Sequence, residues 1–107
     1  MKKEVLLTID TSKRETATIT LSIDGKAYVS SAPTDTRKAQ VVLPLIEKIL
    51  KEHELSLVDI SKLYAPLGPG SFTGLRVGAS IVNTIGSVLH IPINDKSLGV
   101  LLEPVYE

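Results

Sequence analysis

The stretch Gly68-Pro69-Gly70-Ser71-Phe72-Thr73-Gly74-Leu75-Arg76-Val77-Gly78 decides how this chain of 107 residues is organised. Gly68 and Gly70 permit positive φ and close backbone approach, and Ser71 or Thr73 can cap the N-terminus of a helix. A short apolar run that favours a strand comes just before. A strand, a glycine-rich turn and a helix N-terminus together form a suitable place to hold an anion.

The same glycines allow a second interpretation, in which they only let a helix pack tightly on a sheet. Their positions, 68, 70, 74 and 78, do not fit Gly-x-Gly-x-x-Gly. They do not fit the Walker A motif either, because no Lys-Ser/Thr pair follows them. Spacing therefore leaves both phosphate binding and helix packing open.

Composition predicts one small domain, residues 1–107, with an aliphatic core. Twelve acidic and twelve basic side chains cancel, which argues against direct nucleic-acid binding, since phosphate neutralisation needs surplus Lys and Arg. The absence of Cys excludes disulfides and thiolate metal sites, and two His argue against a His-rich metal site. The uncharged stretch 77–94 is too polar and interrupted for a membrane span, and no signal peptide is visible, so we expect a cytoplasmic protein.

Hydrophobic periodicity predicts the order β-β-β-α-β-α-β. The expected elements are strands Val5–Ile9, Thr16–Ile23 and Lys26–Ser31, helix Arg37–His53, strand Ile60–Pro66, helix Phe72–Leu89 and a last edge strand Ile91–Asn94. A hairpin turn at Asp24-Gly25 joins the second and third strands, and Pro44 should kink the first helix or disrupt its first half. An antiparallel meander followed by parallel strands with crossover helices predicts an α/β fold with a mixed five-stranded sheet and two main helices. This is the ribonuclease H-like arrangement, also found in each lobe of the actin, Hsp70 and sugar-kinase (ASKHA) superfamily.

The helix Phe72–Leu89 carries apolar residues all round its axis, which predicts burial on every side. A domain of this size offers a sheet on one side only, so we expect a partner on the other. The expected interface consists of Gly74, Leu75, Gly78, Val82 and Ile85 on this helix and Val42, Ile46 and Ile49 on the first helix. The alternative is that the helix lies between the sheet and the first helix.

Two motifs taken together resemble the TsaB (YeaZ-like) family: Leu7-Thr8-Ile9-Asp10-Thr11-Ser12 and the stretch Gly68–Gly78. Leu43-Pro44-Leu45-Ile46 and Ile91-Pro92 also look like that family. The resemblance spans nearly the whole chain but covers only the family's N-terminal lobe, since typical members are about twice this length.

This resemblance implies a non-catalytic partner of the related enzyme TsaD in making N6-threonylcarbamoyladenosine (t6A) on tRNA. TsaB-like proteins pair with TsaD through helices of the N-terminal lobe and can also pair with themselves. We therefore expect a TsaD-like partner, a homodimer when the chain is alone, and contact with tRNA only through the complex.

The candidate nucleotide or phosphate site is a weak one, made of Asp10, Thr11, Ser12, Gly68, Gly70 and Ser71. In kinase-like relatives of this fold, similar loops touch phosphate. A cleft needs two walls, and the second lobe is missing from these 107 residues. We therefore expect no resident cofactor and at most weak ATP or ADP binding at a partner interface.

Catalytic and metal-binding residues are not expected in this chain. In nucleases of this fold a carboxylate at the position of Asp10 binds metal together with other carboxylates. Here Asp24 lies in a turn, and only Asp95 could approach Asp10. Two enzyme classes stay open as rivals: an ATP-binding lobe of a split kinase-like enzyme, and a ribonuclease H-like nuclease.

Overall fold

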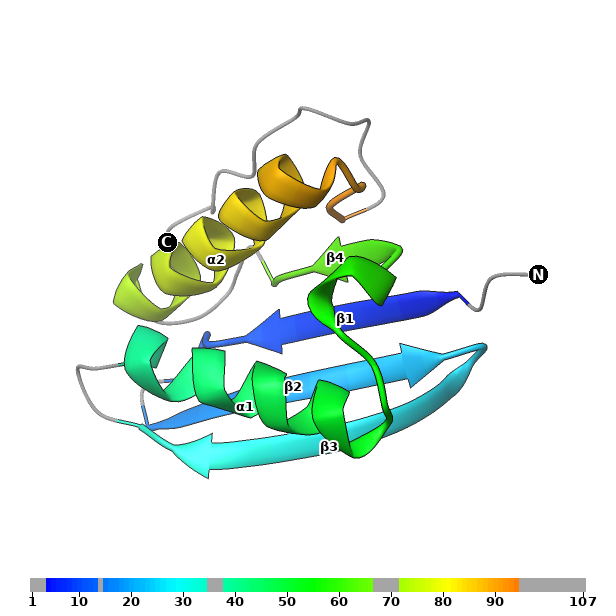
Figure 1. The fold of residues 1–107 in the computed structure, drawn as a ribbon. Coiled ribbons are helices and arrows are strands. Elements are labelled where there is room, and N and C mark those ends of the chain that lie inside the picture. Colours follow the sequence, from blue (N-terminus) through cyan, green and yellow to red (C-terminus); the bar gives the residue numbers. More distant parts are fainter. Residues whose placement is uncertain (1–3, 14, 35–37, 67–71, 95–107) are drawn as a thin grey trace.

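The computed structural model describes residues 4–13, 15–34, 38–66 and 72–94 (Figure 1). Its elements are strands β1 (Val5–Asp10), β2 (Thr16–Ile23) and β3 (Lys26–Pro33), helix α1 (Lys38–Glu52), the short 3-10 helix η1 (Leu57–Asp59), strand β4 (Lys62–Tyr64) and helix α2 (Phe72–Leu89). The order of the first six predicted elements is confirmed. The predicted strand Ile60–Pro66 shortens to β4.

The sheet has four strands in the order β3-β2-β1-β4. The β1–β2 and β2–β3 pairs are antiparallel, and β1–β4 is parallel. Both helices lie on one face of the sheet (Figure 1). On that face alternate residues of β1 and β2 are buried, as a strand with one covered face requires: Val5, Leu7, Ile9, Ala17, Ile19 and Leu21.

The β2–β3 hairpin turns at Asp24 and Gly25, as predicted. Their φ values of +50° and +87° are the left-handed conformations of a type I′ turn, which matches the twist of the strands. Asp24 also ties the hairpin to the start of β1, because its Oδ1 accepts a 2.8 Å hydrogen bond from the Glu4 N–H. The turn therefore fixes the register of the meander.

Helix α1 continues through Pro44, so of the two effects predicted for Pro44 the disruption of the first half is wrong, and a kink stays a prediction. Pro44 is exposed and leaves the Gln40 carbonyl on the outer side of the helix without its intrahelical donor. The opposite side packs onto the sheet through residues that lie before and after the proline: Val42, Ile46, Ile49 and Leu50. The free energy gained by packing this side of α1 on the sheet thus outweighs the cost of the hydrogen bond that Pro44 removes.

Helix α2 has the predicted bounds, and the chain itself covers only one of its sides, so cover of the other side by a partner stays a prediction. One side faces the sheet and is buried, with Leu75, Ala79 and Val82 in the core. The other side carries Arg76, Ser80, Thr84 and Ser87, which are exposed. The two helices lie side by side on the sheet, so α2 does not lie between the sheet and α1 as the alternative packing requires.

A fifth strand is absent from the described residues, so the five-stranded sheet is corrected to four strands. Residues 91–94 reach the sheet through one parallel bridge, Leu63↔Ile93. Beyond it, the side-chain amide of Asn94 replaces a strand: its Oδ1 accepts from the Ala65 N–H and its Nδ2 donates to the Ala65 carbonyl, both at 2.9 Å. Asn94 itself has a φ of +50°, which turns the chain out of the extended direction.

Within the part of the chain that the structure describes, no helix is long and apolar enough to cross a membrane.

Candidate functional site

The loop that follows β1 is joined to the first turns of α2. Strands β1 and β4 are parallel, so their carboxyl ends meet at one edge of the sheet, where α2 begins. At this edge the Thr11 hydroxyl donates a 2.5 Å hydrogen bond to the Gly74 carbonyl, and Thr11 is only 1% exposed. In open α/β folds this edge is where ligands commonly bind.

Gly78 explains how closely the helix approaches the strand. A Cβ atom at this position would lie 2.8 Å from Thr11 Oγ1 and 3.6 Å from the Ile9 carbonyl oxygen. Any larger residue would push α2 away from the end of β1. At Gly78 the packing interpretation of the glycine motif therefore holds.

Asp10 and Ser12 form a closed turn at the surface of the same loop. Asp10 Oδ1 accepts hydrogen bonds from the Ser12 N–H at 3.0 Å and from the Ser12 hydroxyl at 2.6 Å. Both residues are half-buried. The carboxylate thus orders the loop and brings a negative charge to its surface, which opposes an approaching phosphate unless a cation accompanies it.

The predicted phosphate-binding residues are consequently divided. Asp10 and Ser12 lie at the surface, whereas Thr11 is buried and donates its hydroxyl proton to the Gly74 carbonyl inside the chain. Phosphate binding by these loop residues stays a prediction. Gly68, Gly70 and Ser71 lie outside the described residues. The sequence signal that could have separated Thr11 from its neighbours is the alternation of β1, whose buried positions are Val5, Leu7 and Ile9.

No metal centre of three or more His, Asp or Glu side chains forms among the described residues. Asp24 lies near the amino end of β1, where it binds the Glu4 N–H, and Asp10 lies at the opposite end of the strand. These two carboxylates therefore do not share a site. Asp95, the other candidate, lies outside the described residues.

Most residues of the predicted partner interface lie inside this chain, and pairing through them stays a prediction. Its buried members are Gly74, Leu75, Gly78, Val82, Val42, Ile46 and Ile49, and Ile85 is half-buried against the core. Apolar residues at helical spacing mark the side of each helix that faces the sheet. The side available to a partner consists of the residues that this pattern leaves out.

The outward side of α2, here called the α2 outer face, consists of Val77, Ser80, Thr84 and Val88. Their spacing of three, four and four residues places them on one side of the helix. Ser80, Thr84 and Val88 are exposed, Val88 by 71%, and Val77 is half-buried. The face combines small polar residues, which admit a neighbouring helix, with an exposed valine.

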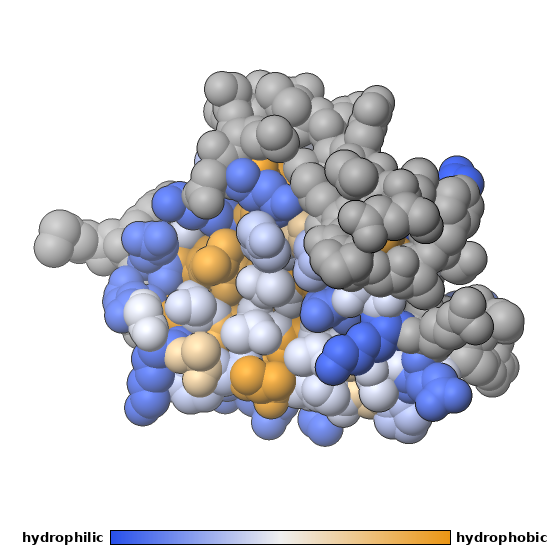
Figure 2. Space-filling model, turned by 180° about the vertical axis from the view of Figure 1, so that it is seen from behind, coloured by the Kyte–Doolittle hydropathy of each residue, from blue (hydrophilic) through white to orange (hydrophobic). Residues whose placement is uncertain are grey.

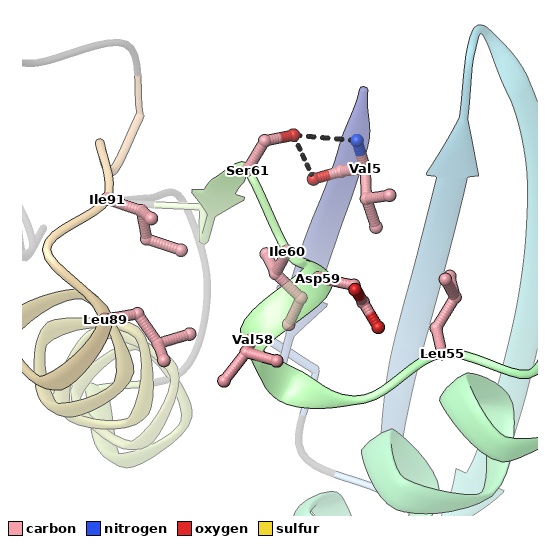
Figure 3. A pocket seen from close by; sticks show the side chains of 8 residues that line it. All are labelled: Val5, Leu55, Val58, Asp59, Ile60, Ser61, Leu89 and Ile91. Carbon is pink, nitrogen blue, oxygen red and sulfur yellow. Dashed lines mark hydrogen bonds between the residues drawn. The ribbon is translucent and has the colours of Figure 1, made fainter. Parts of the chain in front are cut away.

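A hollow of about 590 Å³ lies at the other end of β1, between η1 and the end of α2 (Figure 3). Its polar side chains are already paired. Ser61 Oγ accepts from the Val5 N–H at 2.7 Å and donates to the Val5 carbonyl at 2.9 Å, and Asp59 Oδ2 accepts from the Ser56 N–H at 2.8 Å. The remaining lining is aliphatic: Leu55, Val58, Ile60, Leu89 and Ile91. The hollow carries no arrangement of groups suited to catalysis.

Comparison with known proteins identifies the family. The family model described as "TsaD: tRNA N6-adenosine threonylcarbamoyltransferase" matches residues 32–95, more than half of the chain. This chain belongs to the TsaB/TsaD family. Several of its curated relatives carry the TsaB name, which confirms the resemblance seen in the sequence.

Among these TsaB/TsaD relatives, the "tRNA threonylcarbamoyladenosine biosynthesis protein TsaB" of Haemophilus influenzae is 32% identical over 93 residues, which cover 87% of this chain and 39% of the relative. The TsaB protein of Escherichia coli is 33% identical over 88 residues, which cover 82% of this chain and 38% of the relative. The chain thus spans about two fifths of the length of these curated relatives.

Solved structures agree with the TsaB/TsaD assignment. YeaZ from Pseudomonas aeruginosa superimposes with a TM-score of 0.79 at 29% identity, covering 88% of this chain and 44% of that protein. A second solved protein, described as having similarity to peptidase YeaZ from Pseudomonas aeruginosa, gives a TM-score of 0.80 at 29% identity over 88% of this chain and 43% of its own. The fold of β1–β4 with α1 and α2 is therefore YeaZ-like.

Proposed function

We propose that this chain is a non-catalytic interaction subunit in the biosynthesis of t6A on tRNA, and that it pairs with a TsaD-like enzyme. The observation that carries the proposal is the match to TsaB-named relatives over more than four fifths of the chain, supported by the YeaZ-like fold. Since the chain spans 39% of such a relative, we assign residues 1–107 to one lobe, the N-terminal one.

The chemistry of the β1 edge supports a role without catalysis. The Thr11 hydroxyl donates a hydrogen bond to the Gly74 carbonyl, and the Asp10 carboxylate accepts one from the Ser12 hydroxyl. Thr11 therefore has a carbonyl and not a general base beside its hydroxyl, and the Asp10 carboxylate holds the loop through both the N–H and the hydroxyl of Ser12. A formal net charge of zero also favours contact with tRNA through the partner rather than directly.

The α2 outer face is the proposed docking surface for the TsaD-like partner. Ser80 and Thr84 present short side chains, so a helix of the partner can approach the α2 backbone closely. Val88 supplies exposed apolar surface at one end of the face. A stable complex should bury on the order of 1,200–2,000 Å² in total, so the surface must extend beyond this single helix.

Co-purification with a TsaD-like protein tests the proposal. Wild-type chain should form a complex, and Ser80→Arg or Thr84→Arg should weaken it by at least about tenfold, equivalent to ~1.4 kcal/mol. Val29→Arg is the matched control, because Val29 is 66% exposed on β3, at the opposite edge of the sheet from the strands that α2 contacts. A well-folded wild-type chain that forms no complex, or a complex that withstands both arginine variants, would contradict the docking proposal.

An ATP-binding lobe is the second candidate, favoured by the contact of the 10–12 loop with α2 at the carboxyl edge of parallel strands. We propose no resident cofactor and at most weak ATP or ADP binding at the partner interface, because the Asp10 charge faces the same surface. Calorimetry of the isolated chain with ATP and ADP should show weak binding or none. Micromolar affinity would favour the kinase-like candidate.

A nuclease is the remaining rival, and the separation of Asp24 from Asp10 argues against it. The chain should cleave neither RNA nor ATP on its own. Metal-dependent RNA cleavage that disappears in Asp10→Asn would support the nuclease instead.

A further inference from the structure

The outer edge of β3 has a hydrogen-bonding pattern that can be read from its register. Lys26 pairs with Ile23 across the two-residue turn, and the Thr34 N–H donates to the Glu15 carbonyl at 2.8 Å just past the other end of the strand. In an antiparallel pair, bonded and non-bonded positions alternate. The even-numbered residues of β3 therefore bond to β2, and Ala27, Val29 and Ser31 direct their N–H and C=O groups outward.

This edge is open in the part of the chain that the structure describes, because β3 is the last strand on its side of the sheet (Figure 1). Natural proteins usually protect such an edge with charges, prolines or bulges. Here Lys26 and Pro33 lie at the two ends, and the residues between them carry no charge. Val29, in the middle, is 66% exposed.

The side chains of the outward-facing residues lie on the face of the sheet opposite the helices. Thr18 and Ser31 form a 3.1 Å hydrogen bond between their hydroxyls on that face, and Val29 is paired with Thr20 in the adjacent strand. Figure 2 shows this side of the molecule as largely pale, moderately polar surface with separate hydrophobic patches, and with the strongly hydrophilic residues toward its borders. No like charges there oppose the approach of an identical surface along the edge.

We propose that β3 pairs antiparallel with β3 of a second copy of this chain, about a two-fold axis at Val29. In this register Val29 lies opposite Val29 of the second copy, and Ala27 lies opposite Ser31 of that copy. Each outward N–H and C=O of these three residues then gains a partner, as in a regular antiparallel ladder. Lys26 falls opposite Ala32 of the second copy, so no like charges are paired.

The two valines at the axis meet on the open face of the sheet, where each covers apolar surface of the other. The two four-stranded sheets join into one continuous sheet. An interface made of one strand per copy is smaller than the ~1,200 Å² of standard complexes, so the dimer is a weak one. Self-association of this kind uses a different surface from the α2 outer face.

Sedimentation of two matched lysine variants tests the pairing over a range of about 10–500 µM, suited to a weak interface. Val29→Lys places two like charges opposite each other at the axis and should weaken dimerisation at least tenfold. Val58→Lys changes a valine that is 76% exposed on η1, outside both the β3 edge and the α2 outer face, and should leave dimerisation unchanged. A wild-type chain that is monomeric over the whole range, or a dimer that Val29→Lys weakens no more than Val58→Lys does, overturns the proposal.

Cross-linking gives a second readout, because the chain contains no cysteine. Bonded antiparallel pairs have Cα atoms about 5.5 Å apart, which is within disulfide range. Under mild oxidation Val29→Cys should therefore form a covalent dimer at least ten times faster than Val58→Cys, whose side chain is 76% exposed on η1. Equal rates for the two variants count against pairing at β3.

Discussion

The Thr11 hydroxyl and the Gly74 carbonyl, 63 residues apart in the chain, are joined by a 2.5 Å hydrogen bond. This bond physically connects the two motifs that carry the family resemblance, the end of β1 and the start of α2. Gly78, one turn further along α2, makes the approach possible because it has no Cβ to meet Thr11. The two motifs therefore form one structural unit before any ligand or partner is considered.

Thr11→Val should lower the free energy of unfolding by about 1–2 kcal/mol, because it leaves the buried Gly74 carbonyl without this donor while nearly preserving volume. Urea unfolding followed by circular dichroism measures the change. Thr11→Ser is the control, since it retains the hydroxyl and removes only a methyl group. A loss for Thr11→Val no larger than that for Thr11→Ser would contradict the structural role of the hydrogen bond.

Gly78→Ala should destabilise the chain although alanine is the better helix former. The helix gains roughly 0.5–1 kcal/mol from alanine, whereas the new Cβ would lie 2.8 Å from Thr11 Oγ1. Overpacking of this kind typically costs about 1–3 kcal/mol, so the net effect is a loss of about 1 kcal/mol or more. Thermal and urea unfolding provide the measurement.

A double-mutant cycle tests whether Thr11 Oγ1 is the atom that makes Gly78→Ala destabilising. Thr11→Ala removes Oγ1, after which the nearest remaining atom to the new Cβ is the Ile9 carbonyl oxygen at 3.6 Å, an ordinary contact. Gly78→Ala should then cost less in the Thr11→Ala background, with a coupling energy of about 1 kcal/mol. If the two changes in the free energy of unfolding are strictly additive, overlap with Thr11 is not the reason why a side chain at position 78 destabilises the chain.

The elements that depend on local pattern could be predicted from the sequence. The alternation of Thr16–Ile23, the Asp24-Gly25 turn and the apolar periodicity of α2 each determine their structure within a short stretch. The missing fifth strand could not be predicted, because it depends on the Asn94 amide bonding the Ala65 backbone 29 residues away. A side-chain amide that hydrogen-bonds a strand backbone in place of a neighbouring strand leaves no periodic pattern in the sequence.

The candidate site was predictable in location but not in the role of each residue. The sequence indicates the 10–12 loop and the start of α2, and the structure brings them together. The alternation of β1 extends to Thr11 and indicates that it lies inside, but the partner of its hydroxyl depends on how closely α2 approaches at Gly78. The apolar residues assigned to a partner interface, Val82 and Ile46 among them, lie in the core.

Asp24→Ala should lower the free energy of unfolding by about 1–2 kcal/mol, since alanine is disfavoured at positive φ. The Asp24 φ of +50° and its hydrogen bond to the Glu4 N–H both favour the native residue. Asp24→Asn should remain within about 0.5 kcal/mol of wild type, because Asn-Gly suits a type I′ turn and keeps an acceptor oxygen. Urea unfolding of both variants checks this, and equal losses for the two would exclude backbone conformation as the cause.

Pro44→Ala should stabilise the chain, because Pro44 lies inside α1 on its exposed side. Alanine supplies the N–H that bonds the Gln40 carbonyl and removes the ring clash, which together are worth up to about 3 kcal/mol in a helix interior. Alanine also raises the conformational entropy of the unfolded chain, which offsets roughly 0.4–1 kcal/mol of that gain. The expected net gain is about 1–2 kcal/mol, measured by urea unfolding. Lys48→Ala, one turn further along the same exposed side, should stay within about 0.5 kcal/mol of wild type. If Pro44→Ala were as neutral as Lys48→Ala, α1 would have to accommodate the proline without losing any hydrogen-bond energy to it.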